Sequence, residues 1–166
     1  VNKKHIPIEM HDWKPGELLD KRNWEMEEER RCIEGYQGIP GKYYYYLNHT
    51  FIKHKSRGKI RPDFRSKDLE WFKTLERVMK TPGLGIVSLK RRQIGMSWKA
   101  AVDVIHDATF NKSFDIGMNS KGENDSRILF QKVKYIYQHQ SNFLVADTHS
   151  DRRDALTFVR MGKDER

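Results

Sequence analysis

The predicted fold is decided by residues 84–98, which read Leu84-Gly85-Ile86-Val87-Ser88-Leu89-Lys90-Arg91-Arg92-Gln93-Ile94-Gly95-Met96-Ser97-Trp98. The first six residues are mostly apolar, which predicts a short buried strand. Residues 90–95 make a polar loop, and apolar residues then recur at helical spacing from Ser97 to Phe110. The stretch therefore predicts a strand, a loop and a helix in direct succession.

The same succession follows at once. Phe114–Met118 predicts a second strand, residues 119–122 a loop, and the next segment a second amphipathic helix, marked by Ile128, Leu129, Val133, Ile136 and Tyr137. Two consecutive strand–helix units favour a parallel sheet, so the predicted fold class is α/β with a P-loop NTPase-like parallel sheet. Residues 143–146 and 155–159 are further candidate strands, joined by a polar turn over 147–154.

The upstream half predicts a helical and β-hairpin extension. Its elements are a surface helix over 20–33 with apolar contacts at Trp24, Met26 and Ile33, an aromatic strand over 42–48, a basic hairpin over 51–61, and a helix capped by Ser66 that ends near Met79. We therefore expect residues 1–60 to form an N-terminal extension and residues 61–166 to form the first part of an ATPase-like core.

Composition narrows the class of protein. The 166 residues leave room for one ordinary domain and carry a formal net charge of +9. One cysteine, Cys32, excludes an internal disulfide and a cysteine zinc cage. Neither a membrane-spanning apolar run nor a signal-peptide pattern is present, so we expect a protein that makes no membrane contact and stays in the cytoplasm.

The positive charge is concentrated in the middle of the chain. Residues 53–99 contain fourteen basic and four acidic residues, whereas residues 9–34 contain five basic and nine acidic residues. This central stretch predicts a polyanionic partner.

The loop over 90–97 has part of the pattern of a phosphate-binding loop. In G-x-x-x-x-G-K-[ST], backbone N–H groups surround the phosphates, the lysine reaches the β and γ oxygens, and the hydroxyl binds magnesium. Gly95 and Ser97 hold their expected places, but Met96 occupies the lysine position and Lys90 the position of the first glycine. On this pattern alone the match is weak, because Gly-x-Ser after a strand is often only a turn followed by a helix cap.

The segment Lys90–Trp98 resembles the deviant Walker A loop of phage large terminase subunits, the ATPases that pump genomic DNA into a procapsid. That family commonly shows [KR]-x-R-Q-x-G-x-[ST], in which a cation at the start of the loop serves in place of the usual lysine. Weaker likeness extends from Cys32 to Gln138, through the aromatic segment Gly41–Asn48, the segment Arg61–Arg65 and the segment Ile116–Lys121.

The resemblance implies a site for ATP and Mg2+. Lys90, Arg91 and Arg92 would act on the phosphates, Gln93 and Ile94 would offer backbone N–H groups, Gly95 would admit the phosphate, Ser97 would bind the Mg2+ ion, and Met96 and Trp98 complete the loop. Phe64 and Arg65 would lie near adenine. The alternatives are a solvated Lys90, an Arg91 or Arg92 paired with a carboxylate, an N-capping Ser97, and a Phe64 that packs as a hydrophobic staple.

Several expectations about the whole protein follow from the same resemblance. It implies double-stranded DNA, a portal protein and a small terminase subunit as partners, a homo-oligomeric motor, and the cytoplasm of a bacterial host. The family also has a Walker B strand, in which four apolar residues end in Asp-Glu, and a nuclease domain, and neither is found before Arg166. The resemblance thus implies the N-terminal piece of a longer ATPase, which would not complete hydrolysis alone.

Two other functions remain open from the sequence. Lys53, Lys55, Arg57 and Lys59 either contact nucleic-acid phosphates or form a solvated hairpin edge, so a non-enzymatic basic nucleic-acid-binding module is one alternative. Another P-loop ATPase, such as a helicase, is the second. The tyrosines 43–46 predict a packed strand more than a base-stacking platform, and the seven histidines show no metal-binding spacing.

Overall fold

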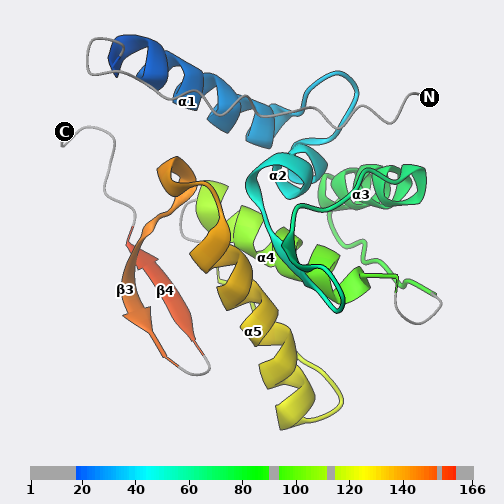
Figure 1. Cartoon of the computed structure of the whole chain (residues 1–166). Helices are drawn as coiled ribbons and strands as arrows, with labels where there is room; N and C mark the ends of the chain where they lie inside the picture. Colours follow the sequence, from blue (N-terminus) through cyan, green and yellow to red (C-terminus); the bar gives the residue numbers. More distant parts are fainter. Residues whose placement is uncertain (1–17, 90–93, 112–114, 153–154, 160–166) are drawn as a thin grey trace. The chain divides into compact units, whose positions relative to one another are not determined.

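The structure is a computed structural model that describes residues 18–89, 94–111, 115–152 and 155–159 (Figure 1). The chain divides into two compact units, Val1–Ile94 and Gly95–Arg166. The first contains α1 (Leu18–Glu34), α2 (Gly41–His49), β1 (Ile52–His54), β2 (Gly58–Ile60) and α3 (Ser66–Met79). The second contains α4 (Met96–Phe110), α5 (Glu123–His139), the 3-10 turn η2 (Asn142–Leu144), β3 (Asp147–Asp151) and β4 (Leu156–Val159).

Helix α1 confirms the predicted surface helix, but its packing face differs from the prediction. Met26 and Ile33, expected as apolar contacts, are 58% and 51% exposed, whereas Glu28 and Cys32 are buried. Glu28 and Cys32 are four residues apart and so lie on the same side of the helix. The side of α1 that packs therefore contains a carboxylate, which sequence periodicity counts as a solvent-facing position.

The predicted aromatic strand over 42–48 is wrong, because these residues form helix α2. The Pro40 carbonyl accepts hydrogen bonds from the N–H groups of Tyr43 and Tyr44, at 2.9 and 2.8 Å, which closes the first helical turn. All four tyrosines are buried. Tyrosine favours strands because it fits a half-buried pleated surface, and here packing on several sides of a short helix outweighs that preference.

Helix α2 begins in close contact with the end of α1. A Cβ atom at Gly41 would lie 2.4 Å from the Cys32 carbonyl oxygen and 2.5 Å from that of Ile33, so only glycine fits. On the other side, the Tyr43 ring stacks on Phe72 of α3 at 5.0 Å. The Tyr43 hydroxyl also accepts a hydrogen bond from the Arg65 N–H at 2.8 Å and donates one to the Arg65 carbonyl at 3.0 Å. Helix α2 thus connects α1 to α3.

A buried polar cluster fastens α1 to α2. Glu28, 2% exposed, accepts hydrogen bonds from the Tyr44 hydroxyl at 2.7 Å and from Arg31 at 2.7 Å. The Nε2 atom of the fully buried His49 lies 3.1 Å from the same carboxylate. A buried carboxylate is tolerated only when its oxygens are paired, and both oxygens of Glu28 are.

Both ionisable groups of this cluster have shifted pKa values. Burial lowers the pKa of His49, against the opposing effect of Glu28. Burial alone would raise the pKa of Glu28, but hydrogen bonds with His49 and Tyr44 and the charge of Arg31 leave it lowered. Because both folded-state pKa values are depressed, the unfolded chain takes up these protons first on acidification. Their stabilisation is therefore lost as pH falls below about 6.5 for His49 and about 4.5 for Glu28.

We expect Glu28→Gln to lower the free energy of unfolding at pH 7.5 by about 2 kcal/mol, because Tyr44, His49 and Arg31 lose their bonds to a buried carboxylate, although Arg31 keeps Glu27. The wild-type chain should become less stable from pH 7 to pH 4, and the variant should lose the part of this pH dependence that lies below about pH 4.5. Urea unfolding followed by circular dichroism measures both effects. Glu34→Gln, in an exposed pair with Arg30, is the matched control and should cost under about 1 kcal/mol. Equal losses in the two variants would contradict the cluster's role.

The basic hairpin and the following helix are confirmed. Strands β1 and β2 pair antiparallel, with Ile52 opposite Ile60 and Lys53 opposite Lys59. Helix α3 begins at Ser66, but its N-cap is Arg65, so the prediction that Ser66 caps the helix is wrong. The two hydrogen bonds between the Tyr43 hydroxyl and the Arg65 backbone hold this helix start against α2.

The apolar segment over 84–89 lies open to solvent. It has no regular secondary structure, and no strand pairs with it among the described residues. Val87 and Leu89 are 93% and 96% exposed, where the sequence predicts a buried strand. A strand needs a neighbour to bind its N–H and C=O groups, and the part of the chain that is described supplies none to this segment.

We expect the double substitution Val87→Ser, Leu89→Ser to change the free energy of unfolding by no more than about 0.5 kcal/mol per site, because both side chains remain in solvent. The contrasting variant is Ile105→Ala, whose side chain is fully buried in α4 and whose loss should cost about 3 kcal/mol. Chemical denaturation of the whole chain compares them. A loss above about 2 kcal/mol in the double variant would mean that the segment is buried.

The second unit is built on two predicted helices that are confirmed. Helices α4 and α5 pack against each other (Figure 1). Their fully or almost fully buried apolar residues are Ala101, Val102, Ile105, Val133 and Ile136. Lys134 of α5 donates to the Asp151 carboxylate and to the Arg152 carbonyl, which joins α5 to the β3–β4 hairpin.

The remaining strand predictions are partly wrong. Strand β4 (Leu156–Val159) confirms the second candidate strand, but residues 142–144 form η2, and the expected polar turn contains β3. Strands β3 and β4 pair antiparallel, with a bulge between Thr148 and Ser150. Residues 115–118 have no regular structure. Both ladders in the described parts of the chain are antiparallel, and no parallel pair of strands is found there. The parallel sheet stays a prediction.

Candidate functional site

The described part of the candidate phosphate loop is the start of α4. Gly95 is the N-cap residue and has φ 78°, in the left-handed region. A Cβ atom added there would meet nothing within 4 Å. Glycine is therefore favoured at this position by the backbone conformation and not by lack of space.

The first turn of α4 presents polar groups to solvent. The Gly95 carbonyl accepts from the N–H groups of Trp98 and Lys99 at 3.0 and 3.2 Å. The N–H groups of Met96 and Ser97 have no partner among the described residues, as is normal for the first residues of a helix. Ser97 is exposed and lies inside the first turn, so the alternative that it acts as the N-cap is wrong. Its hydroxyl and these N–H groups fit the phosphate end of a nucleotide.

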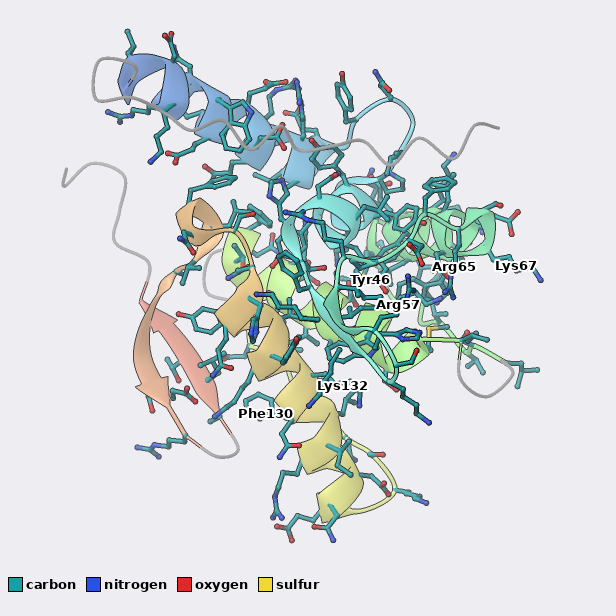
Figure 2. The ribbon with its side chains drawn as sticks, in the orientation of Figure 1. Tyr46, Arg57, Arg65, Lys67, Phe130 and Lys132 are labelled. Carbon is teal, nitrogen blue, oxygen red and sulfur yellow. The ribbon has the colours of Figure 1, made fainter. Side chains whose placement is uncertain are left out.

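Trp98 has a packing role at this helix start. Its ring meets that of Tyr135 edge-on at 5.6 Å, and the Lys132 ammonium lies 5.8 Å from its centroid. Figure 2 labels Lys132 on α5. These contacts hold the N-terminal turn of α4 against α5. No sequence motif indicated Lys132 or Tyr135, because their contact with Trp98 depends on how two helices cross.

The cationic part of the candidate loop, Lys90–Gln93, lies outside the described residues. Ile94 is half-buried and ends the first unit, whereas Gly95 begins the second. The predicted roles of Lys90, Arg91, Arg92, Gln93 and Ile94 therefore stay predictions.

Phe64 and Arg65, the candidate adenine neighbours, belong to the first unit. The Phe64 ring packs on Tyr43 at 5.7 Å, which agrees with a packing role, although its partner is α2 and not the following helix. The Tyr43 hydroxyl binds the Arg65 backbone. The Arg65 side chain is exposed, as is that of Lys67, two residues later (Figure 2). The adenine role of both residues stays a prediction.

The four hairpin cations are brought together on one exposed ribbon. Lys53, Lys55, Arg57 and Lys59 are all exposed. His54 shapes the turn, since its Nδ1 atom accepts hydrogen bonds from the N–H groups of Ser56 and Arg57, both at 3.3 Å. Lys53, Lys55, Arg57 and Lys59 are thus the exposed cations of the basic hairpin.

Comparison with known proteins gives no family for this chain. No family model matches the sequence, and no curated protein is significantly similar to it. Within residues 18–89, 94–111, 115–152 and 155–159, no three His, Cys, Asp or Glu side chains come close enough to hold a metal ion, and no helix is long and apolar enough to cross a membrane.

We expect Gly95→Ala to cost about 1 kcal/mol of unfolding free energy, because alanine is strained at φ 78°. The matched control is Gly122→Ala. Gly122 is the N-cap of α5, also with nothing within 4 Å, but it has φ −161°. That variant should change stability by no more than about 0.5 kcal/mol. Thermal and urea unfolding compare the pair, and an equal effect at both glycines would contradict the left-handed conformation at Gly95.

Proposed function

We propose that this chain is the N-terminal part of the ATPase region of a phage large terminase subunit and that it binds ATP with Mg2+ at Lys90–Ser97. The observation that carries the proposal is the start of α4, which follows a sequence with three consecutive cations: it has a left-handed glycine, an exposed serine hydroxyl and two N–H groups that no described residue binds. A helix N-terminus of this kind favours bound phosphate, and the cations would offset its charge.

Each residue of the loop would have its own role in binding the nucleotide and Mg2+. The N–H groups of Met96 and Ser97 would donate to phosphate oxygens, and Lys90 would lie against the phosphates in place of the lysine that Met96 replaces. Mg2+ takes oxygen ligands and usually keeps several waters, so one hydroxyl from Ser97 beside the phosphates is an adequate protein ligand. When bound, the ion would neutralise charge on the phosphates.

The exposed segment over 84–89 supports the fold part of this proposal. Four apolar side chains, Leu84, Ile86, Val87 and Leu89, are exposed directly before the loop. Such a segment gains stability by joining a sheet. We propose that further sequence of a longer protein supplies that sheet and the carboxylates needed for hydrolysis. Double-stranded DNA, a portal protein, a small terminase subunit and further copies of the chain would be the partners, in the cytoplasm of a bacterial host.

Thermal unfolding with nucleotide tests the proposal. At a concentration one hundred times its dissociation constant, ATP with Mg2+ should stabilise the chain by about 2.7 kcal/mol and raise the melting temperature by roughly 5–10 °C. The double variant Lys90→Ala, Ser97→Ala should abolish this shift, and removal of Mg2+ with EDTA should reduce it.

The control is Ser120→Ala, Lys121→Ala, which removes an exposed serine and an exposed lysine and so changes the net charge equally. It should keep the full shift. No shift in the wild-type chain, or an undiminished shift in the Lys90/Ser97 variant, would exclude this site. The chain alone should show no ATP turnover above the uncatalysed rate.

A further inference from the structure

The basic hairpin places like charges directly opposite one another. In the antiparallel register, Lys53 of β1 faces Lys59 of β2, and both side chains are exposed. Like charges at such a cross-strand pair are destabilising. Lys55 and Arg57, in the turn that joins the strands, add two more cations. The ribbon therefore accumulates positive charge at the expense of its own stability.

Nearby carboxylates do not cancel this charge. In the described part of the chain, Lys53, Lys55 and Lys59 have no carboxylate within ion-pair distance, and Arg57 has one exposed partner, Asp63, at 3.2 Å. In α1, by contrast, Arg30 and Arg31 are both paired with glutamates at 2.5 to 3.0 Å. The unit thus pairs Arg30 and Arg31 of α1 and leaves the hairpin lysines available for an external anion.

The surface offers charge without bare aromatic rings. Tyr43, Tyr44, Tyr45 and Tyr46 are at most 4% exposed. Phe51, at the base of the hairpin, lies under two cations, the Lys59 ammonium at 4.6 Å and the Arg61 guanidinium at 4.9 Å from its centroid. Proteins that bind single strands combine a basic groove with rings on which bases stack. This ribbon lacks the second component, which favours a duplex.

We propose that the basic hairpin binds the phosphate backbone of double-stranded DNA. A two-stranded ribbon fits the major groove of B-form DNA, whereas the narrow major groove of A-form RNA excludes it. Lys53 on β1 and Lys59 on β2 would contact DNA phosphates. Lys55 and Arg57, in the turn between the two β-strands, would contact further phosphates. The hairpin belongs to the first unit and contains no residue of the nucleotide loop, so this interface does not depend on the proposed nucleotide site.

Fluorescence anisotropy with the whole 166-residue chain and a labelled 20-base-pair duplex tests the interface. Affinity should fall steeply with salt, by about 0.9 log units per log unit of salt for each phosphate contact. Lys53→Gln, Lys59→Gln should weaken binding about tenfold at 0.1 M salt and reduce the salt slope by about 1.8. Because this variant removes the opposed charges, it should fold at least as well as the wild-type chain, which circular dichroism checks.

The matched control is Lys21→Gln, Lys121→Gln, which changes the net charge by the same amount at residues paired with Glu25 and Asp125. It should keep its affinity within about twofold. Equal losses in the two variants would show attraction by net charge only and overturn the proposal. So would tighter binding of a single strand of the same length, or binding of anionic phosphatidylserine vesicles without binding of duplex DNA.

Discussion

The first unit depends on the burial of one carboxylate. Apart from Glu28 and Cys32, α1 is mostly polar or exposed, so it has little apolar surface with which to hold α2. Glu28 is removed from water and must be paired, and Tyr44, His49 and Arg31 pair it. Because two of these partners lie on α2, the pairing fixes the rotation of that helix.

The orientation of α2 also affects the hairpin formed by β1 and β2. With Tyr44 on Glu28, the neighbouring Tyr43 stacks on Phe72 and hydrogen-bonds the backbone of Arg65. Arg65 begins α3, and two residues before it Asp63 pairs with Arg57 in the hairpin turn. A continuous series of contacts thus leads from a buried charge in α1 to an exposed cation of the hairpin.

The sequence predicted the amphipathic helices and the basic hairpin better than it predicted the packing. Helices α1, α3, α4 and α5 are found where apolar spacing or composition indicated them, and the turn at Gly58 gives the basic hairpin. Helix α2 was missed because β-propensity describes a half-buried surface, and these four tyrosines are buried within a unit. Strand β3 was missed for a related reason. Residues 147–151 have the composition of a polar turn, and they form a strand because they pair with β4.

The candidate sites differ in how far sequence could describe them. The clustering of hairpin cations is visible in the alternation of Lys53, Lys55, Arg57 and Lys59, but only the register shows that Lys53 opposes Lys59. For the nucleotide loop, the prediction depends on the sequence pattern of Lys90–Trp98, and the structure adds the left-handed Gly95 and the exposed Ser97. The burial of Glu28 had no sequence signal, because His49 and Tyr44 reach it from sixteen or more residues away.

Two unfavourable features of the first unit have the same physical meaning. The opposed lysines of the hairpin reduce its stability by charge repulsion. The exposed side chains of Val87 and Leu89 contribute none of the stability that their burial would give. A protein retains such features where another molecule or another part of the polypeptide relieves them. The two features differ in the partner that would relieve them, because an anion such as phosphate would offset the charge of the ribbon and a neighbouring strand would cover the apolar segment. On the two proposals made above, the first unit, held together by the pairing of Glu28, would support two separate contacts: the hairpin with phosphate and residues 84–89 with a neighbouring strand.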